Sequence, residues 1–333
     1  MFCVGSATRK VLSHMKFLVT GTAGFIGSHL AGRLLRDGHR VVGLDSFSDY
    51  YDVRLKEARH RLLCAESGYR GERGAVEDRV LVRRLCAEER FDQVIHLAAQ
   101  AGVRHSLQHP FVYVSSNIEG FLSVLEACRH EGVPRLIYAS SSSVYGTNTK
   151  IPFSESDGVD HPVSLYGATK KCNELMAHAY SHLFGIQTIG LRFFTVYGPW
   201  GRPDMAMWIF SERIRRGEPI SVFNNGEMKR DFTFVDDIVS GICGAIFAPD
   251  LSPYEVFNLG NHRSEFLLDM IAELEQAWGQ KAKLEFLPMQ PGDIPASFAD
   301  ITRAQEKLGF EPRTPISVGI PRFVQWFRDY HAC

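Results

Sequence analysis

The sequence lacks a hydrophobic run that could cross a membrane, because no stretch of about 18 apolar residues occurs in its 333 residues. It also lacks an excess of charge of either sign, since 37 lysines and arginines stand against 38 aspartates and glutamates. A formal net charge of -1 gives no indication of a nucleic-acid or membrane-surface partner. We therefore expect a protein that binds neither nucleic acid nor membranes.

Paired cysteines are also lacking. The seven cysteines are odd in number, and none belongs to a Cys-x-x-Cys pair. This argues against a disulfide framework and against a zinc site, and it is typical of the reducing cytoplasm. We expect a cytoplasmic protein without a metal site. Residues 1–14 lack the apolar core of a signal peptide, and Met15 is an alternative start, so we expect residues 1–14 to be a disordered leader.

A glycine-rich turn stands between an apolar run at residues 16–20 and a helical pattern that extends to Asp37. Gly21, Gly24 and Gly27 give the spacing Gly-x-x-Gly-x-x-Gly. Glycines at such a turn let the backbone approach a pyrophosphate, and the following helix offers free amides and a positive dipole end. A plain strand-to-helix turn is the alternative, but the strand and helix on either side favour a dinucleotide site.

An acidic residue ends the second expected strand, at residues 40–45. Asp45 lies 18 residues after Gly27, close to where a carboxylate binds the adenosine ribose diol of a dinucleotide. Ser46 and Phe47 follow, and neither is basic. A 2′-phosphate would therefore meet repulsion from Asp45, so we expect NAD rather than NADP. An aspartate that only caps a helix is the alternative.

Strands alternate with helices over the first part of the chain, which predicts an α/β fold. The pattern predicts strands near residues 16–20, 40–45, 73–76, 91–98, 134–140 and 187–193, and helices near 52–66, 77–89, 115–131 and 165–184. Strands and helices of these lengths indicate a doubly wound parallel sheet of Rossmann type. We expect residues 15–195 to form the domain that binds NAD.

After Phe194 the alternation becomes looser. Residues 198–203 form a loop rich in glycine and proline. Further strands are expected near residues 220–223, 256–259 and 284–287, and helices near 205–216, 236–247, 265–278 and twice toward the C-terminus. We expect residues 231–260 to return to the first domain. Residues 196–230 and 261–333 should form a smaller C-terminal substrate-binding lobe.

Tyr166 and Lys170 lie four residues apart, which on a helix places a phenol and an ammonium group on one face. A cation beside a phenol lowers the pKa of the phenol toward neutrality, so the pair is expected to act as a general base. This spacing also occurs often by chance. Four serines, Ser140 to Ser143, end an expected strand about 25 residues upstream. A hydroxyl there can hydrogen-bond both a substrate oxygen and the phenol.

These features stand in the order found in the extended short-chain dehydrogenase/reductase superfamily, which the chain resembles over residues 15–330. Within it, several segments resemble the UDP-glucuronate 4-epimerase family, which belongs to the NAD-dependent epimerases and dehydratases. They are HLAAQAGVR (96–104), YASSSSVYG (138–146), HPVSLYGATKK (161–171), GLRFFTVYGPWGRPDMA (190–206), GEMKRDFTFVDDI (226–238) and PMQPGDIP (288–295). The resemblance implies a tightly bound NAD⁺ that is regenerated in each cycle. It also implies interconversion of UDP-glucuronate and UDP-galacturonate through a 4-keto sugar that turns over in the pocket.

The resemblance implies roles for individual residues. Tyr166 would take the proton of the sugar 4-hydroxyl, Ser141 would be its hydroxyl partner and Lys170 would tune it. The residues that would bind the cofactor are Gly21, Gly24, Phe25, Ile26, Gly27, Asp45, Ser46, Val76, Leu97, Ala98, Ala99, Asn117, Ser140, Tyr166, Lys170 and Phe193. The residues that would bind the UDP-sugar are Ser142, Ser143, Thr195, Arg202, Asp204, Met205, Phe223, Arg230, Gln290 and Asp293.

Arg202 is expected to meet the C5 carboxylate of the sugar, because a guanidinium can bind a carboxylate through two parallel hydrogen bonds. A solvated loop arginine is the alternative. Ser142, Ser143 and Thr195 could supply further hydroxyl donors to the carboxylate. Thr195 stands where the glucose-type epimerases carry Asn.

The chain departs from its relatives at three positions that bear on specificity. Ala75 stands where many relatives have an Asp on the adenine amino group, so that contact is expected to be lost. Gln290 replaces a phosphate-binding Arg of the glucose-type enzymes. Ser297 replaces a bulky Tyr, so the sugar pocket should be roomier, which makes strict glucose/galactose specificity less expected.

Other activities remain open at this point. A UDP-glucuronate decarboxylase is the nearest alternative, because the 4-keto intermediate is a β-keto acid that is prone to lose CO₂. A broader UDP-sugar 4-epimerase is a second. A 4,6-dehydratase is disfavoured, because Ser142 and Ser143 occupy positions where dehydratases carry an Asp-Glu pair. A non-catalytic NAD-binding regulator is remote, because the Tyr166 and Lys170 pair is intact.

The helices expected near residues 115–131 and 165–183 have apolar faces beyond what one face of a sheet needs. In the superfamily such helices pair across a two-fold axis as a four-helix bundle. The resemblance therefore implies a homodimer.

Overall fold

The computed structural model describes residues 14–289 and 294–332. Residues 1–13 of the expected leader and two predicted substrate-binding residues, Gln290 and Asp293, lie outside the described residues. Within the described ranges, no helix combines the length and the apolar character that crossing a bilayer requires.

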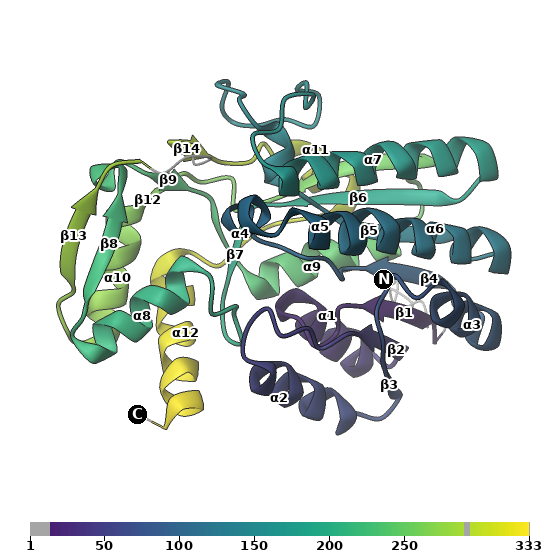
Figure 1. The fold of residues 1–333 in the computed structure, drawn as a ribbon, viewed down its shortest axis with the longest axis horizontal. Coiled ribbons are helices and arrows are strands. Elements are labelled where there is room, and N and C mark those ends of the chain that lie inside the picture. The colour runs from purple at the N-terminus through teal and green to yellow at the C-terminus, as the bar shows by residue number, and fades with distance from the viewer. Residues whose placement is uncertain (1–13, 290–293, 333) are drawn as a thin grey trace, which may run out of the picture.

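A seven-stranded sheet forms the centre of the molecule (Figure 1). Its strands are parallel and lie in the order β11-β6-β5-β4-β1-β2-β3. They are β1 (Lys16–Thr20), β2 (Arg40–Asp45), β3 (Tyr69–Arg73), β4 (Gln93–His96), β5 (Arg135–Ser141), β6 (Gln187–Phe193) and β11 (Tyr254–Leu259). Because the order runs outward in both directions from β1, the predicted doubly wound parallel sheet is confirmed.

Helices cover both faces of the sheet, so strand side chains of both orientations are buried. On β1, Phe17 and Val19 pack into one hydrophobic core and Leu18 into the other, as the period of two requires. The first core also receives side chains from α1 (Phe25–Arg36) and α9 (Val235–Phe247). The second receives them from α3 (Arg79–Glu89), α6 (Gly120–Glu131) and α7 (Leu165–Phe184). Burial on both faces explains why these strands appear in the sequence as continuous apolar runs.

A smaller group of elements follows the carboxyl end of β6 and lies on the left in Figure 1. Its strands β8 and β13 pair in parallel, and its helix α10 packs against α8 and α12. These elements are α8 (Ala206–Arg216), β8 (Pro219–Phe223), α10 (Leu267–Trp278), β13 (Lys283–Leu287) and α12 (Ile316–His331). The short strands between the two parts are β7 (Thr195–Tyr197), β9 (Lys229–Arg230), β10 (Phe232–Phe234), β12 (Glu265–Phe266) and β14 (Ala296–Ser297).

The remaining helices flank the sheet. They are α2 (Val53–Cys64), α4 (Val103–Gln108), α5 (Pro110–Tyr113) and α11 (Thr302–Leu308). The helix α2 packs against α1 and β3, and α11 packs against α9 and β11. The Rossmann-type half therefore draws on segments from both ends of the chain.

The third strand lies a few residues before its predicted position. The sequence predicts a strand near residues 73–76, but β3 spans Tyr69–Arg73. It is an edge strand that pairs only with β2 among the described residues, and most of its side chains are partly or fully exposed. It therefore lacks the apolar run by which the buried strands were found. Val76, which suggested the strand, is buried beyond its end.

A π-helical turn precedes α6. The sequence predicts one helix near residues 115–131, but the helical backbone begins at Pro110 and passes through a π-helical turn at Val114–Glu119 before α6 begins at Gly120. Such turns are frequent at functional sites. This one carries Asn117, whose side chain is buried.

Candidate active site

A cavity of about 820 Å³ lies at the carboxyl ends of β1, β2, β4, β5 and β6, the edge where doubly wound sheets bind ligands. Most residues that the sequence pointed to line this one cavity, although they come from many separate segments. They are Gly21, Gly24, Phe25, Ile26, Gly27, Asp45, Ser46, Val76, Leu97, Ala98, Ala99, Ser140, Ser141, Ser142, Ser143, Tyr166, Lys170, Phe193, Thr195, Arg202, Asp204 and Met205.

The turn between β1 and α1 has no room for side chains at two of its glycines. A Cβ on Gly21, where φ is +78°, would lie 2.8 Å from the backbone nitrogen of Ala98. A Cβ on Gly27 would lie 2.0 Å from the carbonyl oxygen of Gly21. No side chain caps the N-terminus of α1, and no acidic residue stands in its first turn. The turn therefore fits a pyrophosphate against the helix amides.

Asp45 stands at the end of β2 and is held by two backbone amides. The amide of Ala23 donates to Oδ2 at 2.9 Å, and the amide of Phe47 donates to Oδ1 at 2.8 Å. Each carboxylate oxygen can accept more than one hydrogen bond. The fixed carboxylate therefore lines the cavity with acceptor capacity left for the two hydroxyls of a ribose.

Tyr166 lies in the first turn of α7, where the Ser164 hydroxyl caps the helix by accepting from the amide of Gly167 at 3.0 Å. Burial raises the pKa of Tyr166, and the hydrogen bond with Ser141 and the charge of Arg202 oppose that shift without cancelling it. The expectation that Lys170 lowers this pKa toward neutrality is therefore wrong for the structure described here. The cost of burying a phenolate exceeds the effect of the nearby charges.

The ammonium group of Lys170 is directed to the backbone. Its Nζ donates to the carbonyl oxygen of Ala139 at 2.8 Å, and the residue is 2% exposed. Burial lowers the pKa of Lys170 to about 8. The side chain therefore still carries a charge at neutral pH and loses it in mildly alkaline solution.

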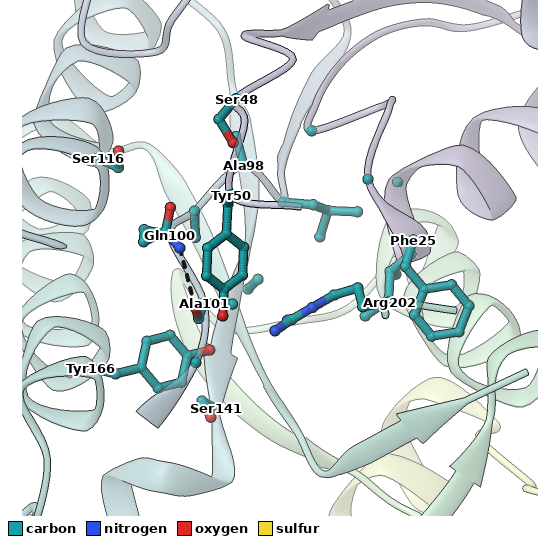
Figure 2. Close-up of a pocket in the computed structure, with 18 of the residues that line it drawn as sticks. Phe25, Ser48, Tyr50, Ala98, Gln100, Ala101, Ser116, Ser141, Tyr166 and Arg202 are labelled. Carbon is teal, nitrogen blue, oxygen red and sulfur yellow. Dashed lines mark hydrogen bonds between the residues drawn. The ribbon is translucent and has the colours of Figure 1, made fainter. Parts of the chain in front are cut away.

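Arg202 reaches the same space from the turn that follows β7. Figure 2 shows its guanidinium extending toward Tyr166 and Tyr50. Its Nε donates to Oδ1 of Asp204 at 3.0 Å, Nη2 pairs with Oδ2, and the hydroxyl of Tyr50 donates to that same oxygen at 3.1 Å. The side chain of Arg202 is 23% exposed. A cation is thus held in place beside the phenol by a carboxylate and a second tyrosine.

The serines at the end of β5 face different partners. The hydroxyl of Ser140 donates to Glu174 at 2.6 Å, and Glu174 forms a buried, two-pronged ion pair with Arg192 at 2.8 Å for each contact. The hydroxyl of Ser141 accepts from the amide of Ser143 at 3.2 Å, and it lies close enough to Tyr166 to lower the pKa of the phenol. Of the two, Ser141 is therefore the one placed beside the tyrosine.

Of the predicted residues that the structure describes, three do not line the cavity. The side chain of Asn117 is used to hold the loop after β4, because it bonds the backbone nitrogen and oxygen of Gln100 at 2.8 and 3.0 Å. Phe223 ends β8, under the guanidinium of Arg104 at 5.1 Å. Arg230 lies on β9 and donates to the carbonyl oxygens of Lys229 and Pro295 at 2.8 and 3.3 Å. Asn117 is thus a positioning residue in this structure, and the roles of Phe223 and Arg230 stay predictions.

Sequence reasoning missed several polar residues of the cavity. They lie on the loops after β2 and β4 and on neighbouring helices, namely Ser48, Tyr50, Tyr51, Lys56, Gln100, Arg104, His105 and Ser116. Figure 2 shows Ser48, Tyr50 and Gln100 on the side of the cavity opposite Phe25. The available signal was their position, because the loops that follow the carboxyl ends of central strands form the ligand crevice of such sheets.

Comparison with known proteins gives the chain a family. The model of the NAD dependent epimerase/dehydratase family matches residues 17–260. The chain belongs to this family. The matched range includes the glycine-rich turn, Asp45, the Tyr166 and Lys170 pair and Arg202. In this epimerase/dehydratase, all the charged groups of the cavity that are described above therefore lie within the residues that match the family model.

Several similar family members are named UDP-glucuronate 4-epimerases. The chain is 46% identical to UDP-glucuronate 4-epimerase 4 of Arabidopsis thaliana, over 95% of this chain and 76% of that protein. It is 43% identical to a probable UDP-glucuronate 4-epimerase of Rhizobium meliloti, over 94% and 97% of the two chains. The crystal structure of UDP-glucuronic acid 4-epimerase from Bacillus cereus, in complex with UDP-glucuronic acid and NAD, matches with a TM-score of 0.90 at 36% identity. That match covers 95% of this chain and all of the other.

Proposed function

We propose that this protein is an NAD-dependent UDP-glucuronate 4-epimerase, which interconverts UDP-glucuronate and UDP-galacturonate. The proposal rests mainly on the presence of two functional groups in the same cavity, an alcohol-binding pair and a cation. Tyr166 and Ser141 form a pair suited to oxidising an alcohol, and Arg202 places a fixed cation beside them. Asp204 pairs with Nε and Nη2 of Arg202, so a uronate carboxylate can bind the remaining edge of the guanidinium, for which a neutral sugar has no negative charge. The relatives named for this activity support the same substrate.

The residues of the cavity fit NAD. The glycines of the first turn leave space for the pyrophosphate, and Asp45 is placed for the adenosine ribose. Asp45 is followed by Ser46 and Phe47 rather than by a basic residue, which favours NAD over NADP. The chemistry that NAD⁺ would supply when bound is reversible hydride exchange at C4 of the sugar, together with the positive charge of its nicotinamide ring.

The side chains of this protein handle the proton. Tyr166 takes the proton of the sugar 4-hydroxyl as the C4–H bond is broken, and it gives the proton back after the 4-keto sugar has turned over. Ser141 lies beside the phenol in the cavity, where its hydroxyl can hold the same sugar oxygen. Because burial alone raises the pKa of Tyr166, its action as a base depends on positive charge nearby. Arg202 is the cation of the protein that lowers this pKa, and Lys170, whose Nζ donates to the carbonyl oxygen of Ala139, is a second cation that lines the cavity.

The 4-keto uronate poses a further problem, because it is a β-keto acid. Loss of CO₂ requires the bond between C5 and the carboxylate to align with the carbonyl π system. We propose that Arg202, with hydroxyls of Ser142, Ser143 and Thr195, holds the carboxylate away from that alignment. All four residues line the cavity. A bidentate guanidinium fixes both the position and the plane of a carboxylate.

We also propose a division of labour along the chain. Residues 15–195 with 231–260 would bind NAD, and residues 196–230 with 261–333 would bind the UDP-sugar, apart from α11, which packs against α9 and β11. Support comes from the placement of the glycine turn and Asp45 on the large sheet and of Arg202 on the turn after β7. A homodimer and a cytoplasmic location belong to the same proposal. The cysteines Cys64, Cys86, Cys128, Cys172 and Cys243 are all free thiols, which suits a reducing compartment.

The test is product analysis by NMR with a panel of UDP-sugars and no added cofactor. We expect UDP-glucuronate to be converted to UDP-galacturonate by the purified protein, and UDP-glucose to be converted at least ten times more slowly, since the neutral sugar cannot bind Arg202. Turnover of UDP-glucose and UDP-N-acetylglucosamine but not of the uronates would overturn the substrate assignment. UDP-pentose as the main product would indicate a decarboxylase instead.

A further inference from the structure

Arg59, on α2, is among the most deeply buried charged side chains of the described protein, at 1% exposure. It joins three segments that are far apart in sequence. Its Nη1 donates to the carbonyl oxygen of Ala23 at 3.0 Å and to the hydroxyl of Tyr51 at 2.7 Å. Its Nη2 donates to the carbonyl oxygens of Trp200 and Gly201 at 2.6 and 3.0 Å. The guanidinium therefore sits between the glycine-rich turn and the turn that carries Arg202.

None of these acceptors is a carboxylate. Three are backbone carbonyls and one is a phenol, and Nε has no hydrogen-bond partner among the described residues. Removing a charged group from water without an opposite charge is costly, and a packed apolar side chain would avoid that cost. The position of Arg59 is therefore better explained by the geometry that its two nitrogens impose than by a gain in stability.

The contacts of Arg59 complete a continuous path across the cavity wall. The carboxylate of Asp45 accepts from the amide of Ala23, and the carbonyl of Ala23 accepts from Arg59. The other nitrogen of Arg59 binds Trp200 and Gly201, and Arg202 is the next residue. Each step is a hydrogen bond or runs through covalent bonds of Ala23, of the guanidinium or of the backbone before Arg202. The path thus links the carboxylate placed for the adenosine ribose to the cation placed for the sugar.

The turn at the far end of the path needs an external constraint. Trp200 has φ +60°, a left-handed conformation that costs energy for a residue with a side chain. Its ring packs against Trp326 and Tyr330 of α12, with centroid distances of 5.3 and 5.5 Å, and its carbonyl is bound by Arg59. The backbone that aims Arg202 is therefore held on one side by aromatic packing and on the other by the guanidinium.

We propose that Arg59 is a positioning and specificity-determining residue that couples the dinucleotide-binding turn to Arg202, so that retention of NAD and preference for an acidic sugar depend on the same side chain. The inference rests on the proposed function, because it takes Arg202 as the group that meets the sugar carboxylate. Arg59 itself does not line the cavity and touches neither ligand. Its effect is transmitted through the backbone of both turns.

Binding two turns at once in fixed geometry requires the planar guanidinium of an arginine. Two nitrogens of one rigid group point to opposite turns, whereas a lysine offers a single point charge on a flexible stem. Arg59→Lys keeps the charge and most of the bulk but cannot bind both turns in fixed geometry. It is therefore a sharper test than removal of the side chain.

The experiment compares wild-type and Arg59→Lys holoenzyme in two measurements. The first is the amount of NAD released by acid from a known amount of purified protein, which we expect to fall by more than half in the variant. The second is calorimetric binding of UDP-glucuronate and UDP-glucose. We expect the dissociation constant for UDP-glucuronate to rise about tenfold and that for UDP-glucose to change less than twofold, since a small displacement of a positioning group has effects of at least this size.

Leu63→Ala is the matched control. Leu63 lies on the same helix, is 4% exposed and packs in the hydrophobic core, and it takes no part in the hydrogen bonds of Arg59. We therefore expect its truncation to lower the melting temperature and to leave those hydrogen bonds in place. NAD content and sugar preference should stay at wild-type values in this variant. Equal weakening of both sugars in Arg59→Lys, or effects in Leu63→Ala of the same pattern, would reduce Arg59 to a structural residue and overturn the inference.

The two proposals fail in different ways. If the wild-type protein itself shows no preference for UDP-glucuronate, the substrate assignment is wrong. If the wild-type preference is present and Arg59→Lys retains both that preference and its NAD, the coupling role of Arg59 is wrong. NAD content is measured without any sugar. It therefore tests whether Arg59 supports the dinucleotide-binding turn, whichever sugar the wild-type protein prefers.

Discussion

At Tyr166, burial and charge act in opposite directions on one proton. Burial raises the pKa of the phenol, while Ser141 and Arg202 lower it by a smaller amount. The proposed action of Tyr166 as a base therefore requires further positive charge near the phenol, which an occupied dinucleotide site would supply. Proton removal outside the catalytic cycle is disfavoured in consequence.

Arg202 provides a prediction about side reactions. In Arg202→Ala the sugar carboxylate is no longer held, so we expect the Michaelis constant for UDP-glucuronate to rise tenfold or more, the loss expected for a charged hydrogen-bonded partner. UDP-pentose should also appear beside UDP-galacturonate, because the 4-keto acid is free to lose CO₂. Chromatography of the products measures both effects.

Asp204→Asn is the comparison for Arg202→Ala, because it keeps the guanidinium but weakens the carboxylate that orients it. It should give an intermediate amount of UDP-pentose. If Arg202→Ala forms no more UDP-pentose than the wild-type protein, Arg202 does not protect the intermediate.

Lys170 provides a prediction about pH and stability. Burial lowers the pKa of Lys170 to about 8, from an ordinary value of 10.5. Between these two values the unfolded chain binds a proton that the folded chain does not, so the contribution of Lys170 to folding becomes more favourable as the pH rises from 8 to 10.5. Below pH 8 that contribution is lost, and burial of the charged group opposes folding.

The measurement is urea denaturation of wild-type protein and Lys170→Met at pH 7.5 and pH 10. We expect the difference in unfolding free energy, wild type minus variant, to increase by roughly 2–3 kcal/mol over this range. Groups other than Lys170 cancel in the difference. A difference that does not depend on pH would show that Lys170 titrates normally in the folded protein.

The elements of the sheet show what can be predicted from the sequence. Strands Lys16–Thr20, Arg40–Asp45 and Gln187–Phe193 lie where their apolar runs placed them, because strands buried on both faces are apolar throughout. Tyr69–Arg73 was misplaced because an edge strand carries no such run. The large elements could therefore be predicted from burial, whereas the partly exposed edge could not.

The site shows the same distinction between local and distant signals. The glycine turn and the Tyr166 and Lys170 pair are short motifs, so the sequence revealed them. Arg59 and Tyr50 gain their roles from contacts with residues that are distant in sequence. Trp200 lies 141 positions after Arg59, and Asp204 lies 154 positions after Tyr50. No local pattern records such a contact. The altered pKa of Tyr166 was missed for a related reason, because the degree of burial depends on the whole fold.

The ion pair of Glu174 and Arg192 provides a prediction about how α7 is held. It is 2–4% exposed and links α7 to β6, while Ser140 adds β5 through its bond to Glu174. Glu174→Gln leaves Arg192 buried beside a neutral partner, which should lower the free energy of unfolding by about 3–5 kcal/mol. Chemical denaturation measures this loss.

Asp37→Asn serves as the control for Glu174→Gln, since it breaks a solvent-exposed pair with Arg33. Exposed pairs contribute little, so its unfolding curve should stay close to that of the wild-type protein. A loss in Glu174→Gln no greater than in Asp37→Asn would mean that the buried pair does not anchor α7.

At the scale of the whole molecule, large apolar side chains are exposed on neighbouring helices. Leu175 and Leu183 on α7 are 60% and 66% exposed, Phe111 on α5 is 85% exposed and Leu122 on α6 is 40% exposed. A cluster of this kind is typical of a surface that binds a partner. It supports the proposed homodimer through a four-helix bundle.

Light scattering after size exclusion tests the dimer. We expect the wild-type protein to have twice the mass of one chain and Leu175→Arg to have the mass of a monomer, because a charge in the interface would be buried without a partner. Val318→Arg is the control, since Val318 is an exposed apolar residue on α12 and its replacement should leave a dimer. A monomeric wild-type protein would contradict the proposal.

The central claim is that one carbon of a UDP-uronate is oxidised and then reduced from the other side within a single cavity. The most direct measurement follows deuterium from UDP-[4-²H]glucuronate by NMR, with purified protein, no added cofactor and ordinary water as solvent. We predict UDP-galacturonate that retains the deuterium at C4, because the hydride leaves and returns in the same site. Deuterium lost to the solvent, or label found only in UDP-pentose, would contradict the account.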